Sequence, residues 1–330
     1  MKCFYHNDHD GLFAAGCIAV DFPGGNGDDA KYLAVDYKDS FPLACVERDE
    51  LVWIVDFSIE PDLMRRLLEI TPHVVWIDHH QTAIDKYAGF EHPLHGVRDA
   101  SQAACVLTYK YITWLLGLPR NAELRRRETS RHQVEFLPTP DEIYEEPPEV
   151  LDNLVPLSLR YVADRDTWTW RLGPATQWFH DGLNLHNELR PKGELMKRLL
   201  HVFDGSTESQ IEMINEILLP GRIIEQYRTQ WFERYRAAWA YDTTFEGHRA
   251  LAMNLQMCGS DGFGHAFHEY PLVIAFAHDG LQYQVSLYSH ELQGIDVSKL
   301  AEKYGGGGHK GAAGFPCKEL PWRRPSMPGE

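Results

Sequence analysis

Short apolar runs alternate with helical patterns along the first hundred residues of the chain. Runs rich in β-branched and aromatic residues predict strands at 2–6, 31–35, 51–55 and 73–77. Helical patterns are predicted at 11–20, 61–70 and 100–116. Nearly continuous apolar strands separated by helices are typical of a parallel sheet whose two faces are both covered. We therefore expect an α/β fold with a doubly wound parallel sheet.

The pattern changes in the rest of the chain. Residues 119–150 carry an arginine cluster and then the acidic stretch PTPDEIYEEPPE, which favours a solvated loop or insertion. A basic flap that contacts a substrate phosphate is the alternative. Helical, charged sequence follows, and strand-like runs resume near 242, which predicts a smaller α/β domain with a mixed sheet. The expected organisation is a first domain over 1–185, a helical linker over 186–241 and a second domain over 242–330.

Composition and charge narrow the class of protein. A chain of 330 residues is longer than one core usually requires, so two domains are expected. The formal net charge of −16 argues against a protein that grips long nucleic acid, because such binding depends on a basic surface. Small phosphorylated substrates are not excluded, because metal ions are able to hold them.

Other features bear on the cellular compartment. No stretch approaches the roughly 18 apolar residues of a membrane span, and the start MKCFYH lacks the apolar segment of a signal peptide. We expect a cytoplasmic protein without a membrane partner. The six cysteines are widely spaced and form no CxxC pair, so free thiols are expected. A homodimer is left open.

Groups able to bind metal follow three of the predicted strands. They are His6, Asp8 and Asp10 after the first strand, Asp56 after the third, and Asp78, His79 and His80 after the fourth. Ligands of doubly wound sheets bind beyond the carboxyl ends of the strands, where these residues would meet. Carboxylates brought so close repel one another unless cations neutralise them. The sequence therefore predicts a metal centre at this edge of the sheet.

The residue types indicate which metal the centre binds. Carboxylates and imidazoles without thiolates suit Mn²⁺, with Mg²⁺ or Co²⁺ as alternatives. The number of groups is too large for one ion and favours a pair, which would activate a water for attack on a phosphoryl group. The stretch YVADRDTW offers a further carboxylate, for which Asp164 is preferred over Asp166. Trp168 and Trp170 are interpreted as core residues, with base stacking as the alternative.

The glycine-rich stretch GGGGHKGAAGF, residues 305–315, is a second candidate site. Four consecutive glycines cost backbone entropy, and their amides are able to approach an anion closely. The alternative is a flexible hinge. We predict a loop that contacts a phosphate or nucleotide through Gly306, Gly307, Gly308, His309 and Lys310.

Taken together and in this order, the motifs HNDHDG, VDF, DHH, ADRD and GGGGHKGAAGF resemble the DHH phosphoesterase superfamily. The glycine-rich ending is similar to the branch with a C-terminal DHH-associated domain of the first type, which includes RecJ-like exonucleases and nanoRNases. The resemblance spans nearly the whole chain. It implies a two-domain hydrolase that uses two metal ions to cleave phosphodiester bonds of short single-stranded oligonucleotides or dinucleotides. A nucleotide bisphosphate phosphomonoesterase and a catalytically silent nucleotide-binding module are the alternatives.

The resemblance also implies a role for each matching residue. One ion would be held by His6 and Asp8, the other by Asp10, His79 and Asp164, with Asp56 between them. Asp78 would orient the histidines, His80 would contact the scissile phosphate, and His309 would bind substrate from the opposite wall of a cleft between the domains. Several members space the first motif as HxxxDxD, whereas this chain is shorter by two residues between the histidine and the first aspartate. His9 in place of His6 is therefore an alternative.

Overall fold

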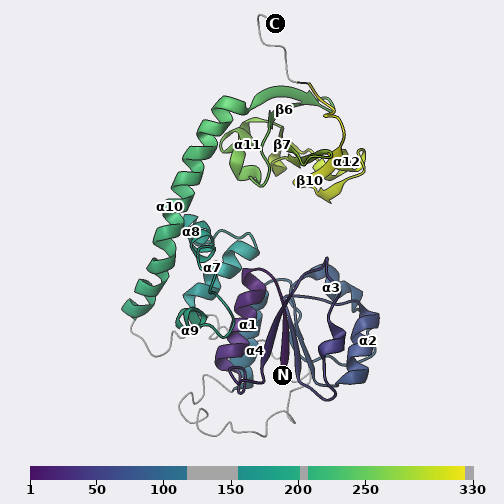
Figure 1. Cartoon of the computed structure of the whole chain (residues 1–330), viewed down its shortest axis with the longest axis vertical. Coiled ribbons are helices and arrows are strands. Elements are labelled where there is room, and N and C mark those ends of the chain that lie inside the picture. The colour runs from purple at the N-terminus through teal and green to yellow at the C-terminus, as the bar shows by residue number, and fades with distance from the viewer. Residues whose placement is uncertain (117–154, 201–206, 324–330) are drawn as a thin grey trace, which may run out of the picture. The chain divides into compact units, whose positions relative to one another are not determined.

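The structure of the chain, a computed structural model, describes residues 1–116, 155–200 and 207–323 (Figure 1). Two compact units divide the chain, Met1–Ile224 and Glu225–Glu330. The division falls within the predicted linker over 186–241. The arginine-rich and acidic segment over 119–150 lies outside the described residues, so both interpretations of it stay predictions.

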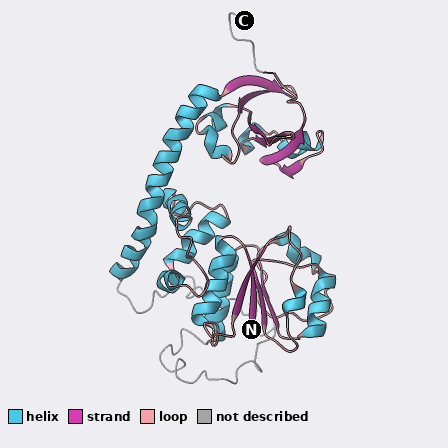
Figure 2. Cartoon of the chain, viewed as in Figure 1, coloured by secondary structure: helices cyan, strands magenta, loops and turns pink. Residues whose placement is uncertain are grey.

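The first unit contains a four-stranded parallel sheet in the order β2-β1-β3-β4. Figure 2 draws its strands in magenta, with helices on either side. Its strands are β1 (Lys2–His6), β2 (Lys31–Val35), β3 (Val52–Val55) and β4 (Val74–Ile77). Every residue of β3 and β4 is buried, as expected of central strands covered on both faces. The predicted doubly wound parallel sheet is thereby confirmed.

Helices pack on both faces of this sheet (Figure 1). Alternate residues of a strand point to opposite faces, so Trp53 and Ile77 enter one core while Ile54 and Trp76 enter the other. The second of these cores is covered by α2 (Pro61–Ile70) and α3 (Gln81–Lys86). The first core is covered by α1 (His9–Asp21), α4 (Ala104–Leu115), α7 (Leu157–Asp166), α8 (Pro174–Leu183) and α9 (Glu194–Leu200).

The segment predicted as a linker begins as part of the first core. Met196 and Leu199 of α9 are buried there, and so is Ile217 of the long helix α10 (Thr207–Trp239). Glycines allow α8 and α10 to approach closely, because a Cβ on Gly182 would lie 2.0 Å from the Ile217 carbonyl oxygen. The first part of this segment therefore stabilises the first unit through packing.

The second unit contains a six-stranded mixed sheet in the order β5-β6-β7-β8-β10-β9. Strands β6 and β7 run parallel, and the other neighbouring pairs run antiparallel. The strands are β5 (Tyr241–Phe245), β6 (His248–Met253), β7 (Leu272–His278), β8 (Tyr283–Tyr288), β9 (Gly307–His309) and β10 (Ala312–Cys317). Short helices α11 (Ala266–Glu269) and α12 (Val297–Glu302) complete the unit. The predicted smaller α/β domain with a mixed sheet is confirmed.

Among the described residues, short 3-10 helices lie at η1 (Leu43–Cys45) in the first unit and at η4 (Ser260–Phe263) and η5 (Glu291–Gln293) in the second. All six cysteines are free thiols, as predicted. Among the helices of the described ranges, none is long and apolar enough to cross a membrane.

Candidate metal centre

The sheet topology brings three strand ends to one place. Strands β1, β3 and β4 are neighbours and run parallel, so the residues after their carboxyl ends emerge at the same edge. His6 ends β1, Asp56 directly follows β3, and His79 follows β4. Asp56 adopts a positive φ of 54°, a conformation that costs a non-glycine residue about 1–3 kcal/mol. Such strain is typical of residues whose side chain is held for a function.

The side chains converge into three groups whose nitrogen and oxygen atoms lie within 4.8 Å of one another. Asp56 belongs to two of the groups, and His79 also belongs to two. The groups are His6–Asp8–Asp56, Asp56–His79–His80 and Asp10–His79–Asp166. Each offers both carboxylate oxygen and imidazole nitrogen, as Mn²⁺, Mg²⁺, Co²⁺ or Zn²⁺ sites do.

Distances within the centre are short on both sides of Asp56. One carboxylate oxygen of Asp56 lies 3.5 Å from Nδ1 of His6, and the other lies 3.2 Å from Nε2 of His79. His6 Nδ1 is in turn 2.7 Å from Asp8 Oδ2, and His79 Nε2 is 3.4 Å from Asp166 Oδ2. Asp56 therefore stands between the two groups of possible ligands.

Whether a cation fits this centre is judged from the buried polar atoms that lack a hydrogen-bond partner. Both carboxylate oxygens of Asp56, Nδ1 of His6 and Oδ2 of Asp166 are buried without a hydrogen-bond partner in the described residues. The His6 and Asp8 atoms are close, but they do not meet in hydrogen-bonding geometry. Unpaired buried polar atoms are costly, and a metal ion is one partner that satisfies several of them together. The donor set therefore fits divalent metal.

Asp10 has a second task besides joining the centre. Its Oδ2 accepts a hydrogen bond of 2.7 Å from the Ala104 amide, and its Oδ1 accepts one of 2.9 Å from the Cys105 amide. These amides open α4, so the carboxylate of Asp10 caps a helix from elsewhere in the chain. Burial raises the pKa of Asp10 well above its ordinary value, and the charges of Asp56 and Asp166 raise it further. A cation at this position would relieve that cost.

The ionisation of the histidines follows from their carboxylate neighbours. Asp56 and Asp8 raise the pKa of His6 to about 10. Burial lowers the pKa of His79, but Asp56, Asp10 and Asp166 outweigh it and raise the value to about 9. Without metal, both imidazoles therefore carry protons at neutral pH. Metal binding must displace these protons, because only the neutral ring nitrogen is a ligand.

Asp78 organises the turn after β4. Its fully buried carboxylate accepts hydrogen bonds from the His79 amide at 2.7 Å and from the His80 amide at 3.1 Å. The same oxygen lies 2.8 Å from Nδ1 of His80. This contact raises the pKa of His80, so a protonated ring with two N–H donors is favoured. Asp78 thus holds the backbone of both histidines and the ring of His80, and the positioning role that the resemblance implies stays a prediction.

The structure differs from the sequence prediction at Asp164. The side chain of Asp164 joins none of the three groups, because it accepts hydrogen bonds from four donors in the segment after α7. The donors are the hydroxyls of Thr169 and Thr176 and the amides of Arg171 and Leu172. Asp166, two residues later in α7, reaches His79 instead. Residues i and i+2 lie on nearly opposite sides of a helix, so only one of these aspartates is able to face the centre.

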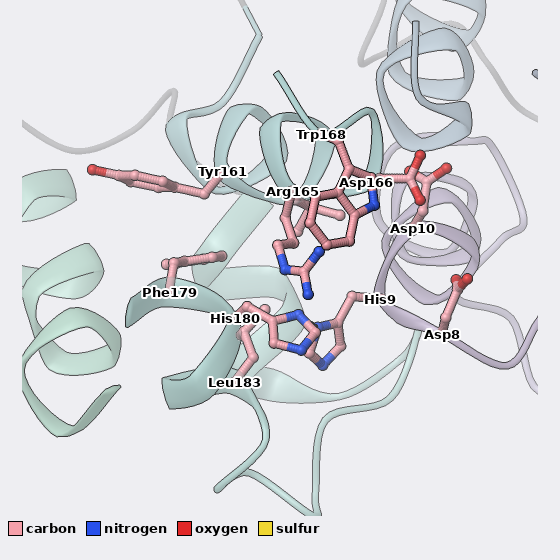
Figure 3. Close-up of a pocket in the computed structure, with 11 residues that line it drawn as sticks. Asp8, His9, Asp10, Tyr161, Arg165, Asp166, Trp168, Phe179, His180 and Leu183 are labelled. Atoms are coloured by element: carbon pink, nitrogen blue, oxygen red, sulfur yellow. Dashed lines mark hydrogen bonds between the residues drawn. The ribbon is translucent and has the colours of Figure 1, made fainter. Parts of the chain in front are cut away.

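His9 also lies apart from the three groups. It opens α1, and its Nδ1 is 3.2 Å from Nδ1 of His180 on α8 (Figure 3). Burial and the charge of His180 lower the pKa of His9 to about 4. His6 rather than His9 joins the possible ligands, although the spacing of the first motif left both open.

The interpretation of Trp168 as a core residue is wrong, since 66% of its surface is exposed.

The glycine-rich segment forms β9 and the first part of β10, which pair antiparallel in the second unit. Gly306 and Gly308 pack against β10, where a Cβ would lie 2.0 Å from the Gly314 carbonyl oxygen and 2.5 Å from the Ala313 Cα. Packing therefore requires glycine at both positions, which the sequence interpretation did not foresee. At Gly307 a Cβ would meet nothing within 4 Å, and His309 and Lys310 are exposed. Contact of these residues with a substrate stays a prediction.

Comparisons with known proteins place this fold. Neither a protein-family model nor a curated protein sequence matches the chain. Among solved structures, the chain is similar to the pGpG-specific phosphodiesterase PggH from Vibrio cholerae, at a TM-score of 0.52 and 13% identity over 96% of this chain and 93% of that one.

Two further structures are similar to the chain. One is a member of the s1p family of ribosomal proteins with a DHH domain, at a TM-score of 0.53 and 12% identity over 96% of this chain and 82% of that one. The other is exonuclease RecJ bound to manganese, at a TM-score of 0.49 and 16% identity over 96% of this chain and 85% of that one. The chain therefore has the fold of the DHH superfamily that its motifs indicate.

Proposed function

We propose that the protein is a metal-dependent phosphodiesterase that hydrolyses short oligonucleotides or dinucleotides. The observation that carries this proposal is the convergence of imidazoles and buried carboxylates around Asp56 at the carboxyl edge of the sheet. A fold shared with a pGpG-specific phosphodiesterase supports the substrate class. The net charge of −16 favours short substrates, since a long polyanion would be repelled.

We propose two divalent metal ions, with Mn²⁺ preferred. His6, Asp8 and Asp56 would hold one ion, and Asp10, Asp56, His79 and Asp166 would hold the other. Asp166 takes the place that the motif alone assigns to Asp164, because its oxygen faces His79. Such ions, when bound, lower the pKa of a water and polarise a phosphoryl oxygen.

The other residues of the centre act on the phosphate. With Nδ1 held by Asp78, the ring of His80 presents Nε2 as its second donor for a phosphoryl oxygen. A protonated His80 would stabilise negative charge that develops there during hydrolysis. His309 and Lys310, with the exposed Gly307, would supply donors to the substrate from the second unit.

A substrate panel tests the proposed function. With Mn²⁺ we expect hydrolysis of a generic phosphodiester and of linear dinucleotides, with slower cleavage of longer single strands and no activity after chelation. The panel also contains a cyclic dinucleotide, a 3′,5′-bisphosphate and pyrophosphate, and product formation is followed by chromatography. Hydrolysis of the bisphosphate alone would replace the proposal by the phosphomonoesterase. Binding of nucleotides without turnover of any substrate would indicate a silent binding module.

His309→Ala tests the role of the second unit. We expect a KM for a dinucleotide raised about tenfold or more, because a charge-assisted hydrogen bond to phosphate is lost. Binding of Mn²⁺, measured by calorimetry, should stay unchanged. The matched control is His265→Ala, which removes another exposed histidine of the same unit. Equal kinetics of the His309 variant and the control would contradict a substrate contact.

A further inference from the structure

A cavity of about 190 Å³ opens beside the metal centre in the first unit (Figure 3). Asp8, Asp10 and Asp166 line it, and all three also belong to the groups able to hold metal. Its other walls carry the apolar side chains Tyr161, Val162, Phe179 and Leu183. A substrate phosphate at the metal centre would therefore place the adjoining part of the substrate at this cavity, which has both charged and apolar walls.

Trp168 lines this cavity although it is 66% exposed. It follows the C-cap residue Thr167 of α7 and adopts a φ of 54°. The Trp168 amide donates to the Arg165 carbonyl oxygen and the Thr169 amide donates to that of Asp164, the two hydrogen bonds of a Schellman motif. Glycine is usual at this left-handed position, so tryptophan is strained there. Neither burial nor backbone geometry explains an indole at position 168.

Arg165 fixes the orientation of the indole. Its guanidinium carbon lies 4.4 Å from the centre of the Trp168 ring and 5.2 Å from that of Trp170. Cation–π contacts of this kind restrain a ring that solvent would otherwise leave mobile. Because Arg165 covers one face of an indole that stays largely exposed, much of the ring remains open to a further planar group.

The chemistry of the walls indicates which group this is. A nucleobase is neutral, planar and apolar on its faces, and stacking on an exposed tryptophan suits any base. A second phosphate fits less well, because three carboxylates line the cavity and the Arg165 guanidinium that also lines it lies over the Trp168 ring. His9 and His180 also line the cavity, and their Nδ1 atoms lie 3.2 Å apart, so imidazole groups stand where the edge of a base would lie.

We propose that this cavity is a nucleobase subsite in which Trp168 stacks on one base of the substrate, next to the phosphodiester that the metal centre cleaves. The inference rests on the proposed phosphodiesterase function and adds a substrate contact to it. Arg165 acts as a positioning residue, since it holds the indole.

Trp168→Gly tests the subsite without the usual risk of unfolding. Glycine relieves the left-handed strain, so the melting temperature should stay equal or rise. The substrates are one dinucleotide and two analogues in which either base is replaced by an abasic residue, assayed with Mn²⁺. For the full-length wild-type protein, we expect removal of one of the two bases to lower kcat/KM at least about fivefold, the lower end of what one base–aromatic stack contributes. In the variant, the ratio of kcat/KM for the intact dinucleotide to kcat/KM for that abasic analogue should fall to about one.

Trp170→Phe is the matched control, because Trp170 also contacts Arg165 but does not line the cavity. It should keep the wild-type ratio. The same loss of kcat/KM for intact and abasic substrates in the Trp168 variant would overturn the subsite. The subsite would also be overturned if removal of a terminal phosphate, and not of a base, lowered kcat/KM in the wild-type protein, because the cavity would then bind an anion. If the wild-type protein hydrolyses no phosphodiester, the proposed function itself fails, which is a different result.

Discussion

Replacing Asp56 by asparagine is expected to lower phosphodiester hydrolysis by roughly a thousandfold or more. Asp56 belongs to both sets of proposed ligands, and its two oxygens face His6 and His79 on opposite sides. An amide has one neutral oxygen in place of the two oxygens of a carboxylate, so one proposed ion site loses its ligand atom and the other loses the negative charge beside it. Metal polarisation of a phosphoryl group contributes several kcal/mol, and each 1.4 kcal/mol is a factor of ten in rate. The measurement is kcat/KM for a dinucleotide at saturating Mn²⁺.

A thermal melt separates loss of metal from loss of the fold. Metal that binds the folded state raises stability by about 2.7 kcal/mol at a hundred times its Kd. The wild-type protein should therefore melt at a higher temperature when Mn²⁺ is added, and Asp56→Asn should lose most of this shift while unfolding cooperatively. Asp62→Asn is the control, because Asp62 is an exposed aspartate of the same unit that pairs with Arg65. Wild-type turnover by the Asp56 variant would contradict its position between two ions.

The parts of the site that the sequence predicts correctly are those fixed by strand ends. A buried parallel strand must end at the edge of the sheet, so an apolar run followed by Asp56 or His79 places these residues without further information. The order of the strands adds only that β1, β3 and β4 are neighbours. For this reason His6, Asp56 and His79 at these strand ends lie in the groups able to hold metal, while their role as ligands stays a proposal.

Site residues on helices and loops are predicted less well than those at strand ends, because their direction depends on how the helix packs. Whether Asp164 or Asp166 faces the centre depends on the rotation of α7 about its axis, which is set by packing against α1, α4 and α8. The apolar residues of so short a helix do not settle that rotation. The sequence signal that favours this outcome is the pair of threonines after α7, whose hydroxyls donate to Asp164 together with two backbone amides.

Trp168 and the glycines of the segment 305–308 show that residue type alone is a weak guide to burial and to ligand contact. An apolar residue type predicts burial, but Trp168 stays exposed because the C-terminal turn of α7 directs it outward. Four glycines predict anion contact, yet Gly306 and Gly308 are also required by the close approach of β10. Residue type alone does not distinguish packing from function when the neighbours come from distant parts of the chain.

The aspartates of α7 provide the other large expected effect. Asp166→Asn should lower hydrolysis by roughly a thousandfold, because it removes a charged oxygen that faces His79, while the fold is retained. Asp164→Asn should instead destabilise the protein by about 2–3 kcal/mol, since an amide nitrogen would face N–H and O–H donors that now donate to a carboxylate. That loss corresponds to a melting temperature lower by roughly 5–10 °C.

The pair of variants distinguishes the two assignments because each serves as the control of the other. Mn²⁺ titration by calorimetry should show weakened binding for Asp166→Asn and near wild-type binding for Asp164→Asn below its melting temperature. Burial raises the pKa of Asp166 to about 6, and Asp56 and Asp8 contribute, whereas His79 lowers it. A cation beside Asp166 favours its charged form, whereas Asp164 is already ionised by its donors, which lower its pKa despite burial. Metal binding lost in the Asp164 variant and kept in the Asp166 variant would restore the assignment that the motif alone favours.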